Sequence, residues 1–238
     1  MKIILFFLTL VLCPFFYVQA EDSVGLRTEI ITLSVDDAVG GLYFWNGEKP
    51  VEFRSVGGGL GPPMSYRGPR DLQLFDSPEA TMPASLAPGG AVSTATPVAS
   101  VQLPEGAGRV LLLTRKQADG PLRLLAFPAS FNEIQTGDYR FFNFSSHDVR
   151  ILLDDETELL PSGQGKTFSN RTWQRNRKDL DIQLGATIDG QMRLVFSSVW
   201  GHNPDLRYFV MIFDGVHISS PLILRKVHDR LPPPPEEP

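Results

Sequence analysis

The chain has 238 residues, of which 42% are hydrophobic and 21% charged, so it is long enough and apolar enough to bury a sizeable globular core. Its formal charge is −5, which argues against nucleic acid as a partner because binding phosphates requires a basic face. The single cysteine, Cys13, lies in the first twenty residues, so the remainder has no thiol for a disulfide, a nucleophile or a metal ligand.

Residues 1–20 have the order of segments that is typical of a secretory signal peptide. Lys2 supplies a positive charge, Ile3–Leu12 is almost entirely apolar, and Val18–Ala20 offers small residues for cleavage. The apolar run is too short for a permanent anchor, and no later run is long enough to span a bilayer. We therefore expect an exported protein that begins at Glu21 and is periplasmic, envelope-associated or extracellular. We expect no integral membrane segment in the mature chain.

The rest of the sequence predicts short β-strands and no helix. Glycine and proline, 21 and 20 residues, interrupt the chain too often for long helical windows, and apolar residues recur with the period of strands. Asn46-Gly47 and Asp189-Gly190 are typical of type I′ hairpin turns, in which both residues adopt positive φ. The expected strands are 26–35, 42–45, 51–54, 72–75, 98–103, 109–114, 122–127, 139–144, 149–153, 180–188, 192–200 and 206–213.

These strands predict an all-β protein, an antiparallel β-sandwich with two packed sandwich-like halves. Residues 77–97 are rich in Pro, Ala, Ser, Thr and Gly without periodicity, so we expect a loop or linker that separates 21–76 from 98–230. The alternative is one large sandwich in which 77–97 is a surface loop. Residues 231–238 are rich in proline and are expected to form a disordered tail.

Motifs for catalysis and cofactors are weak. Ser162–Thr167 ends like a phosphate-binding loop, but Leu160 replaces its first glycine and no helix is predicted after it, so we expect a polar turn. The four histidines lack the spacing of zinc ligands, so we expect no metal and no cofactor. Asp154–Glu158 is interpreted as a solvated acidic turn. The alternative is a secreted hydrolase, such as a glycosidase with paired carboxylates.

One loop has the composition of a binding site. Within Ser169–Lys178, Arg171, Trp173, Arg175 and Arg177 combine guanidinium groups with an aromatic face, which suits an acidic glycan or protein. The alternative is that Trp173 packs on the sandwich and the arginines keep the loop solvated.

Three segments also support export and an all-β fold by resemblance. Pro63–Pro69, Leu103-Pro104 with Arg109–Leu113, and Gly137–Asn143 are similar in residue type and spacing to uncharacterised exported bacterial all-β proteins. This resemblance implies no activity. The resulting expectation is a non-catalytic envelope protein that presents a β-sandwich surface to a protein or glycan partner. The sequence leaves the oligomeric state undetermined.

Overall fold

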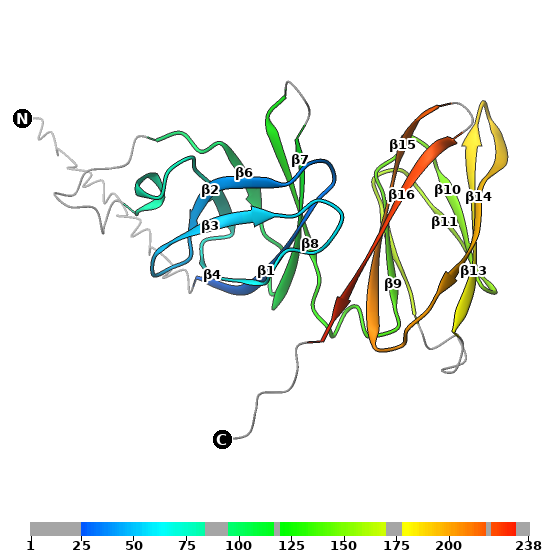
Figure 1. Cartoon of the computed structure of the whole chain (residues 1–238), viewed down its shortest axis with the longest axis horizontal. Coiled ribbons are helices and arrows are strands. Elements are labelled where there is room, and N and C mark those ends of the chain that lie inside the picture. The colour runs from blue at the N-terminus through cyan, green and yellow to red at the C-terminus, as the bar shows by residue number, and fades with distance from the viewer. Residues whose placement is uncertain (1–24, 84–94, 117–119, 170–177, 218–219, 232–238) are drawn as a thin grey trace, which may run out of the picture.

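The computed structural model describes residues 25–83, 95–116, 120–169, 178–217 and 220–231, and it confirms the all-β fold. These ranges contain strands and one short turn of 3₁₀ helix, η1 (Glu79–Thr81). Figure 1 shows two β-rich halves lying side by side, with the N-terminal strands in one and the C-terminal strands in the other. The predicted signal peptide and most of the predicted tail lie outside the described residues. In the part of the chain that is described, no helix has the length and apolar character needed to cross a membrane.

The N-terminal half combines a four-stranded sheet with two hairpin-like pairs. The sheet has the order β4-β1-β7-β8, and the pairs are β2-β3 and β5-β6. The strands are β1 (Leu26–Ser34), β2 (Val39–Trp45), β3 (Pro50–Ser55), β4 (Met64–Gly68), β5 (Asp71–Leu74), β6 (Ala99–Gln102), β7 (Arg109–Lys116) and β8 (Leu122–Pro128).

The C-terminal half is a sandwich of two four-stranded sheets. Their orders are β11-β10-β13-β14 and β12-β9-β15-β16. The strands are β9 (Tyr139–Asn143), β10 (Val149–Leu153), β11 (Glu156–Leu160), β12 (Gly165–Phe168), β13 (Asp179–Ile188), β14 (Gln191–Gly201), β15 (Leu206–His217) and β16 (Ser220–Arg230).

Strand pairing corrects the expected division of the chain. Asp71–Leu74 pairs with Ala99–Gln102 across the 77–97 segment, and β1 pairs with β7. The halves therefore divide between β8 and β9, and 77–97 is an insertion within the first half. The sequence prediction was wrong here because an aperiodic stretch can connect two paired strands as readily as two separate units.

Of the strand pairs that the structure describes, two are parallel, in contrast to the antiparallel pairing predicted. β1 pairs in parallel with β7, and β9 pairs in parallel with β15. The sheets β4-β1-β7-β8 and β12-β9-β15-β16 thus share one topology. In each sheet the first strand of that half, β1 or β9, is the second strand in the order and is parallel to the third, β7 or β15. This internal repeat lies in the topology, and the sequence analysis did not detect it.

The strands that the sequence analysis missed are β4, β11, β12 and β16, and all four lie at sheet edges. Edge strands carry charged residues because one side of their backbone faces solvent. Glu156 and Glu158 in β11 show this, so the predicted acidic turn is confined to Asp154 and Asp155. Lys166, within the supposed phosphate-binding motif, lies in β12 and forms an ion pair with Glu158 at 3.1 Å.

Among the described residues, three apolar clusters hold the structure together, one in each half and one between the halves. Tyr139 and Phe141 face the core of the C-terminal sandwich, whereas Phe142 faces the cluster between the halves. The same alternation places Leu112 inside the N-terminal half and Leu113 between the halves. Strands β7 and β15 are therefore buried on both faces, which explains their unbroken apolar runs.

The two predicted hairpin turns differ. Asp189 and Gly190 have φ of 50° and 76°, as a type I′ turn requires, and they join β13 to β14. In the β2–β3 connection Gly47 has a positive φ but Asn46 does not. The Asn46 side-chain oxygen instead accepts hydrogen bonds from the backbone N–H groups of Glu48 and Lys49, at 3.0 and 2.9 Å. Asn46 therefore stabilises a longer turn through its side chain.

Candidate functional site

The predicted binding residues Arg171, Trp173, Arg175 and Arg177 lie outside the described residues, so their role stays a prediction. The structure describes only the ends of that loop, Ser169 and Lys178. Among the described residues, no group of three or more His, Cys, Asp or Glu side chains is arranged to hold a metal ion.

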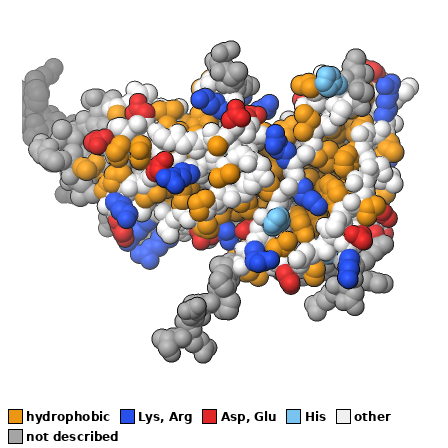
Figure 2. All heavy atoms as spheres, viewed as in Figure 1, with side chains coloured by type: hydrophobic (Ala, Val, Ile, Leu, Met, Phe, Trp, Pro, Cys, Tyr) orange, Lys and Arg blue, Asp and Glu red, His pale blue; other side chains and the backbone are white. Residues whose placement is uncertain are grey.

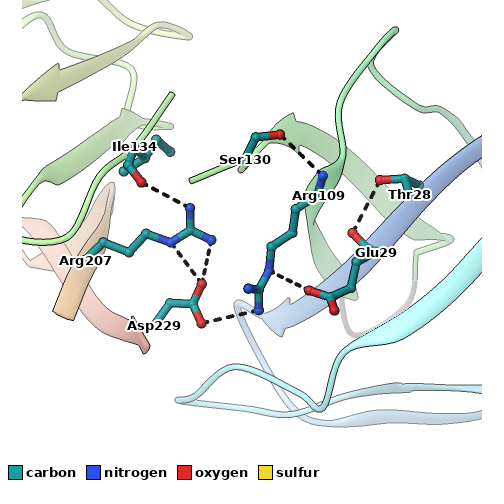
Figure 3. A network of polar contacts seen from close by, with 7 residues as sticks. All are labelled: Thr28, Glu29, Arg109, Ser130, Ile134, Arg207 and Asp229. Carbon is teal, nitrogen blue, oxygen red and sulfur yellow. Dashed lines mark hydrogen bonds and ion pairs between the residues drawn. The ribbon is translucent and has the colours of Figure 1, made fainter. Parts of the chain in front are cut away.

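A polar network joins the two halves (Figure 3). Arg207 is fully buried, and its Nε and Nη2 atoms donate to one carboxylate oxygen of Asp229 at 2.9 and 2.6 Å. Arg109 approaches the other Asp229 oxygen at 3.4 Å and pairs with Glu29 at 3.0 Å. The two arginines also lie over the ring of Phe131, at 3.7 Å for Arg207 and 5.0 Å for Arg109.

This network is better suited to positioning the halves than to binding an ion. Its two guanidinium groups are matched by two carboxylates, so no net charge is available to attract a ligand. Burial lowers the pKa of Arg207, and the hydrogen bonds that Arg207 donates to Asp229 oppose that shift. Arg207 also donates to the Ile134 carbonyl, in the connection between the halves, at 3.3 Å. The network therefore links the two halves and their connection through Arg109, Arg207 and Asp229.

A second candidate is an open groove at one end of the C-terminal half, which we call the hairpin groove. It lies between the β13–β14 and β15–β16 hairpins, which belong to opposite sheets, and its volume is about 550 Å³. Its walls are formed by Ser146-His147, Ile188-Asp189, Arg193–Val195, Asp214–His217 and Pro221. Apolar, basic, acidic and imidazole side chains thus face one concavity.

Hydrogen bonds hold the Ser146-His147 loop, which forms part of the wall of the hairpin groove. The backbone N–H and hydroxyl of Ser146 both donate to Asp214 Oδ1, at 2.9 and 3.0 Å. His147 Nδ1 lies 3.1 Å from the Thr187 carbonyl oxygen, so Nδ1 carries the proton and Nε2 is the acceptor of the neutral ring. Buried Asn143 donates to the carbonyls of His147 and Leu160 at 2.8 and 2.9 Å. This loop is therefore pre-organised.

Beside the groove, the edge strands β14 and β16 face each other along the side of the sandwich. Partly buried Val195, Phe196 and Leu224 pack against the core there. Figure 2 shows hydrophobic side chains gathered on this side of the C-terminal half, with basic side chains beside them. Lys226 of β16 reaches across to β14, with its Nζ 4.6 Å from the Trp200 ring. This edge of the sandwich exposes part of its core.

His202 lies in an aromatic cluster at the other end of the same sandwich. Its ring stacks with Tyr139, with centroids 5.8 Å apart, and lies 6.2 Å from the ring of Tyr208. Its Nδ1 lies 3.4 Å from the Tyr139 hydroxyl. Burial, followed by the charge of Lys226, lowers the pKa of His202 below its ordinary value of 6.5.

This environment predicts a loss of stability in mild acid. As pH falls below 6.5, the unfolded chain binds a proton at His202 while the folded chain keeps the ring neutral, so the free energy of unfolding decreases. We expect His202→Gln to reduce the difference in urea midpoint between pH 7.5 and 5.5, because glutamine does not titrate. His228→Gln is the control, since His228 is exposed. Equal acid sensitivity in the parent and His202→Gln would contradict the prediction.

The sequence analysis did not assemble the hairpin groove. It considered the histidines only by their spacing and predicted the Asp189-Gly190 turn, but it did not place this turn beside Asp214–His217. The two hairpins meet only because their sheets pack together. No protein-family model matches this chain, and no curated protein matches it either. The resemblance to exported bacterial all-β proteins therefore stays an expectation.

Proposed function

We propose that this chain is an exported, non-catalytic binding module whose C-terminal half presents the hairpin groove to a protein or glycan partner of the cell envelope. The observation that carries the proposal is the groove itself: a concavity of about 550 Å³ with apolar walls and a small set of charged and imidazole groups. Binding sites commonly have this composition, because apolar contacts supply affinity and a few polar groups set orientation. Loops and hairpin ends on a rigid sandwich are typical carriers of such sites.

The test of this proposal is a binding screen with matched variants. Arg193 and His217 line the groove and are exposed, so replacing both by Ala should leave the melting temperature unchanged. We expect the double variant to lose at least about tenfold in affinity, about 1.4 kcal/mol, for ligands that the parent retains on a glycan array and in an envelope pull-down.

Two further variants complete the screen. Arg27→Ala/Arg123→Ala, at exposed sites in the other half, should bind like the parent. The Arg171/Arg175/Arg177→Ala variant tests the predicted loop in the same assay. If neither the groove variant nor the loop variant weakens binding, the proposed surface is wrong.

A secreted hydrolase is the second candidate, because Ser146, His147, Asp189 and Asp214 share the groove. In the observed arrangement the Ser146 hydroxyl donates to Asp214, and His147 Nδ1 is engaged by the Thr187 carbonyl. A Ser–His nucleophile–base contact is thus not formed here. We expect no turnover of chromogenic esters or glycosides. Turnover that disappears in both Asp214→Asn and His147→Gln would favour the hydrolase.

Export is tested separately. We expect the protein outside the cytoplasm to begin at Glu21, as measured by N-terminal sequencing or intact mass, because Val18–Ala20 forms the predicted cleavage site. Mature protein that remains in the cytoplasm with Met1 attached would refute this expectation.

A further inference from the structure

The sheet β11-β10-β13-β14 ends in two edge strands that have no sheet neighbour on their outer side among the described residues. Each of the four strands in this sheet is antiparallel to its neighbours. The two edges, β11 and β14, therefore run in opposite directions. Placing a second copy beside the first brings β14 of one next to β11 of the other in antiparallel orientation, which is the pairing already used within this sheet.

Both edges expose apolar side chains on the same face of the sheet. One row of paired residues crosses the sheet from edge to edge. It consists of Leu159 of β11, Arg150 of β10, Gly185 of β13 and Leu194 of β14. Leu159 and Leu194 therefore share one row and one face, with exposed fractions of 52% and 65%. Val199 of β14 lies opposite Asp181 of β13 and is 61% exposed. Asp181, Gln183 and Gly185 are alternate residues of β13, so Val199 lies on the same face as Leu194. Side-by-side copies would cover these side chains.

The lengths of the edges are also compatible. A register shift between Leu184 and Gly185 interrupts the β13–β14 ladder at Val195. The regular stretch 196–201 of β14 that follows has room for all of β11, Glu156–Leu160. This register brings Leu159 beside Val199 or Ser197, on the same face in both strands.

The two edges carry opposite charge. Four carboxylate side chains lie in or next to β11: Asp154, Asp155, Glu156 and Glu158, the last of which is paired with Lys166 of β12. β14 has no acidic residue and carries Arg193. The neighbouring edge strand β16 adds Arg225, Lys226 and Arg230, while its one acid, Asp229, is engaged by Arg207. Although the chain has a formal charge of −5, the side formed by β14 and β16 is thus basic, whereas the β11 edge is acidic.

We propose that copies of this chain associate head to tail, with β11 of one copy adding to β14 of the next as an antiparallel strand. Backbone hydrogen bonds would continue the sheet, the leucine and valine side chains would cover one another, and carboxylates would meet the basic β14–β16 side. The interface is heterologous, so repeated addition produces open chains of copies. This proposal goes beyond the hairpin groove and does not depend on its ligand.

Sedimentation velocity on the purified chain tests the proposal directly. We expect the weight-average mass of the parent to rise with protein concentration. The rise should be smaller at about 1 M than at about 0.1 M salt, where screening lengths are about 3 and 10 Å. Two single-edge variants each block one side: Leu159→Arg places a cation against the basic edge, and Val199→Glu places an anion against the acidic edge. Each should remain monomeric at every concentration.

Mixing the two variants is the decisive measurement. Leu159→Arg retains an intact β14 and Val199→Glu retains an intact β11, so the mixture should associate although neither variant does alone. Val56→Arg and Val98→Glu are the controls, because these valines are 42% and 44% exposed in the other half. They should associate like the parent. Melting temperatures of all variants should match that of the parent, since the replaced side chains are exposed.

Three results would overturn the inference. The first is a parent that stays monomeric at all concentrations. The second is association that both edge variants retain. The third is association that each variant abolishes but mixing fails to restore, which would indicate a symmetric interface. Leu159 and Val199 do not line the groove, and association is measured as mass whereas the groove is tested by ligand binding, so failure of this inference and failure of the proposed function are distinguishable.

Discussion

Replacing Asp229 by asparagine is expected to lower the free energy of unfolding by about 3–5 kcal/mol, the cost of removing one partner from a buried ion pair. Asp229 is the only carboxylate that contacts Arg207 in the network of Figure 3, and Arg207 is fully buried. The variant keeps the shape of the side chain but leaves the guanidinium charge uncompensated between the halves. Urea unfolding at pH 7 measures the change.

An exposed ion pair provides the comparison for Asp229→Asn. Glu105 pairs with Arg70 at 3.1 Å in a solvent-exposed position, so Glu105→Gln should leave the urea midpoint unchanged. The double variant Asp229→Asn/Arg207→Met should recover part of the lost stability, because the buried charge is removed along with its partner. If Asp229→Asn is as stable as Glu105→Gln, the network does not hold the halves together.

Adjacent residues of β9 are expected to have different effects on cooperativity when replaced by alanine. Phe141 packs inside the C-terminal sandwich, against Phe168 at 5.1 Å between ring centroids. Phe142 packs between the halves, against Phe127 of β8 at 4.5 Å. Each substitution should cost about 3–5 kcal/mol, as for other large aromatic side chains replaced in a core.

Calorimetry separates the two outcomes. The parent should unfold in one transition, because the cluster between the halves couples them. Phe141→Ala should lower the temperature of that single transition, since the C-terminal core is weakened while the coupling remains. Phe142→Ala should separate the unfolding of the two halves into two transitions. The reverse pattern, or one transition in both variants, would show that the third cluster does not couple the halves.

Local patterning was sufficient to predict the fold class and most of the inner strands. Short apolar runs bounded by glycine and proline predicted β-structure without helices, because strand formation depends on residue types within a few positions. The type I′ turn at Asp189-Gly190 was predicted for the same reason, since both residues tolerate positive φ. Four edge strands, β4, β11, β12 and β16, were missed because charged residues mask apolar alternation, as Glu156 and Glu158 do in β11.

One available signal in the sequence was not used. Leu111–Leu113 in β7 and Phe209–Phe213 in β15 are continuous apolar runs, whereas a strand with one solvated face alternates. Continuous runs indicate burial on both faces. They point to an apolar cluster between the halves that the strand prediction left out.

The sequence by itself determined that the described chain is built of β-strands, where most inner strands lie, and that Asp189-Gly190 forms a tight turn. Only the tertiary structure decided that β5 pairs with β6 across 77–97, that Arg109 and Arg207 converge on Asp229, and that two hairpins enclose one groove. The physical reason is the range of the interactions. Backbone preference and apolar period act between near neighbours, whereas strand pairing and charge clustering join residues as distant as Arg109 and Asp229, which meet only after the two halves have packed together.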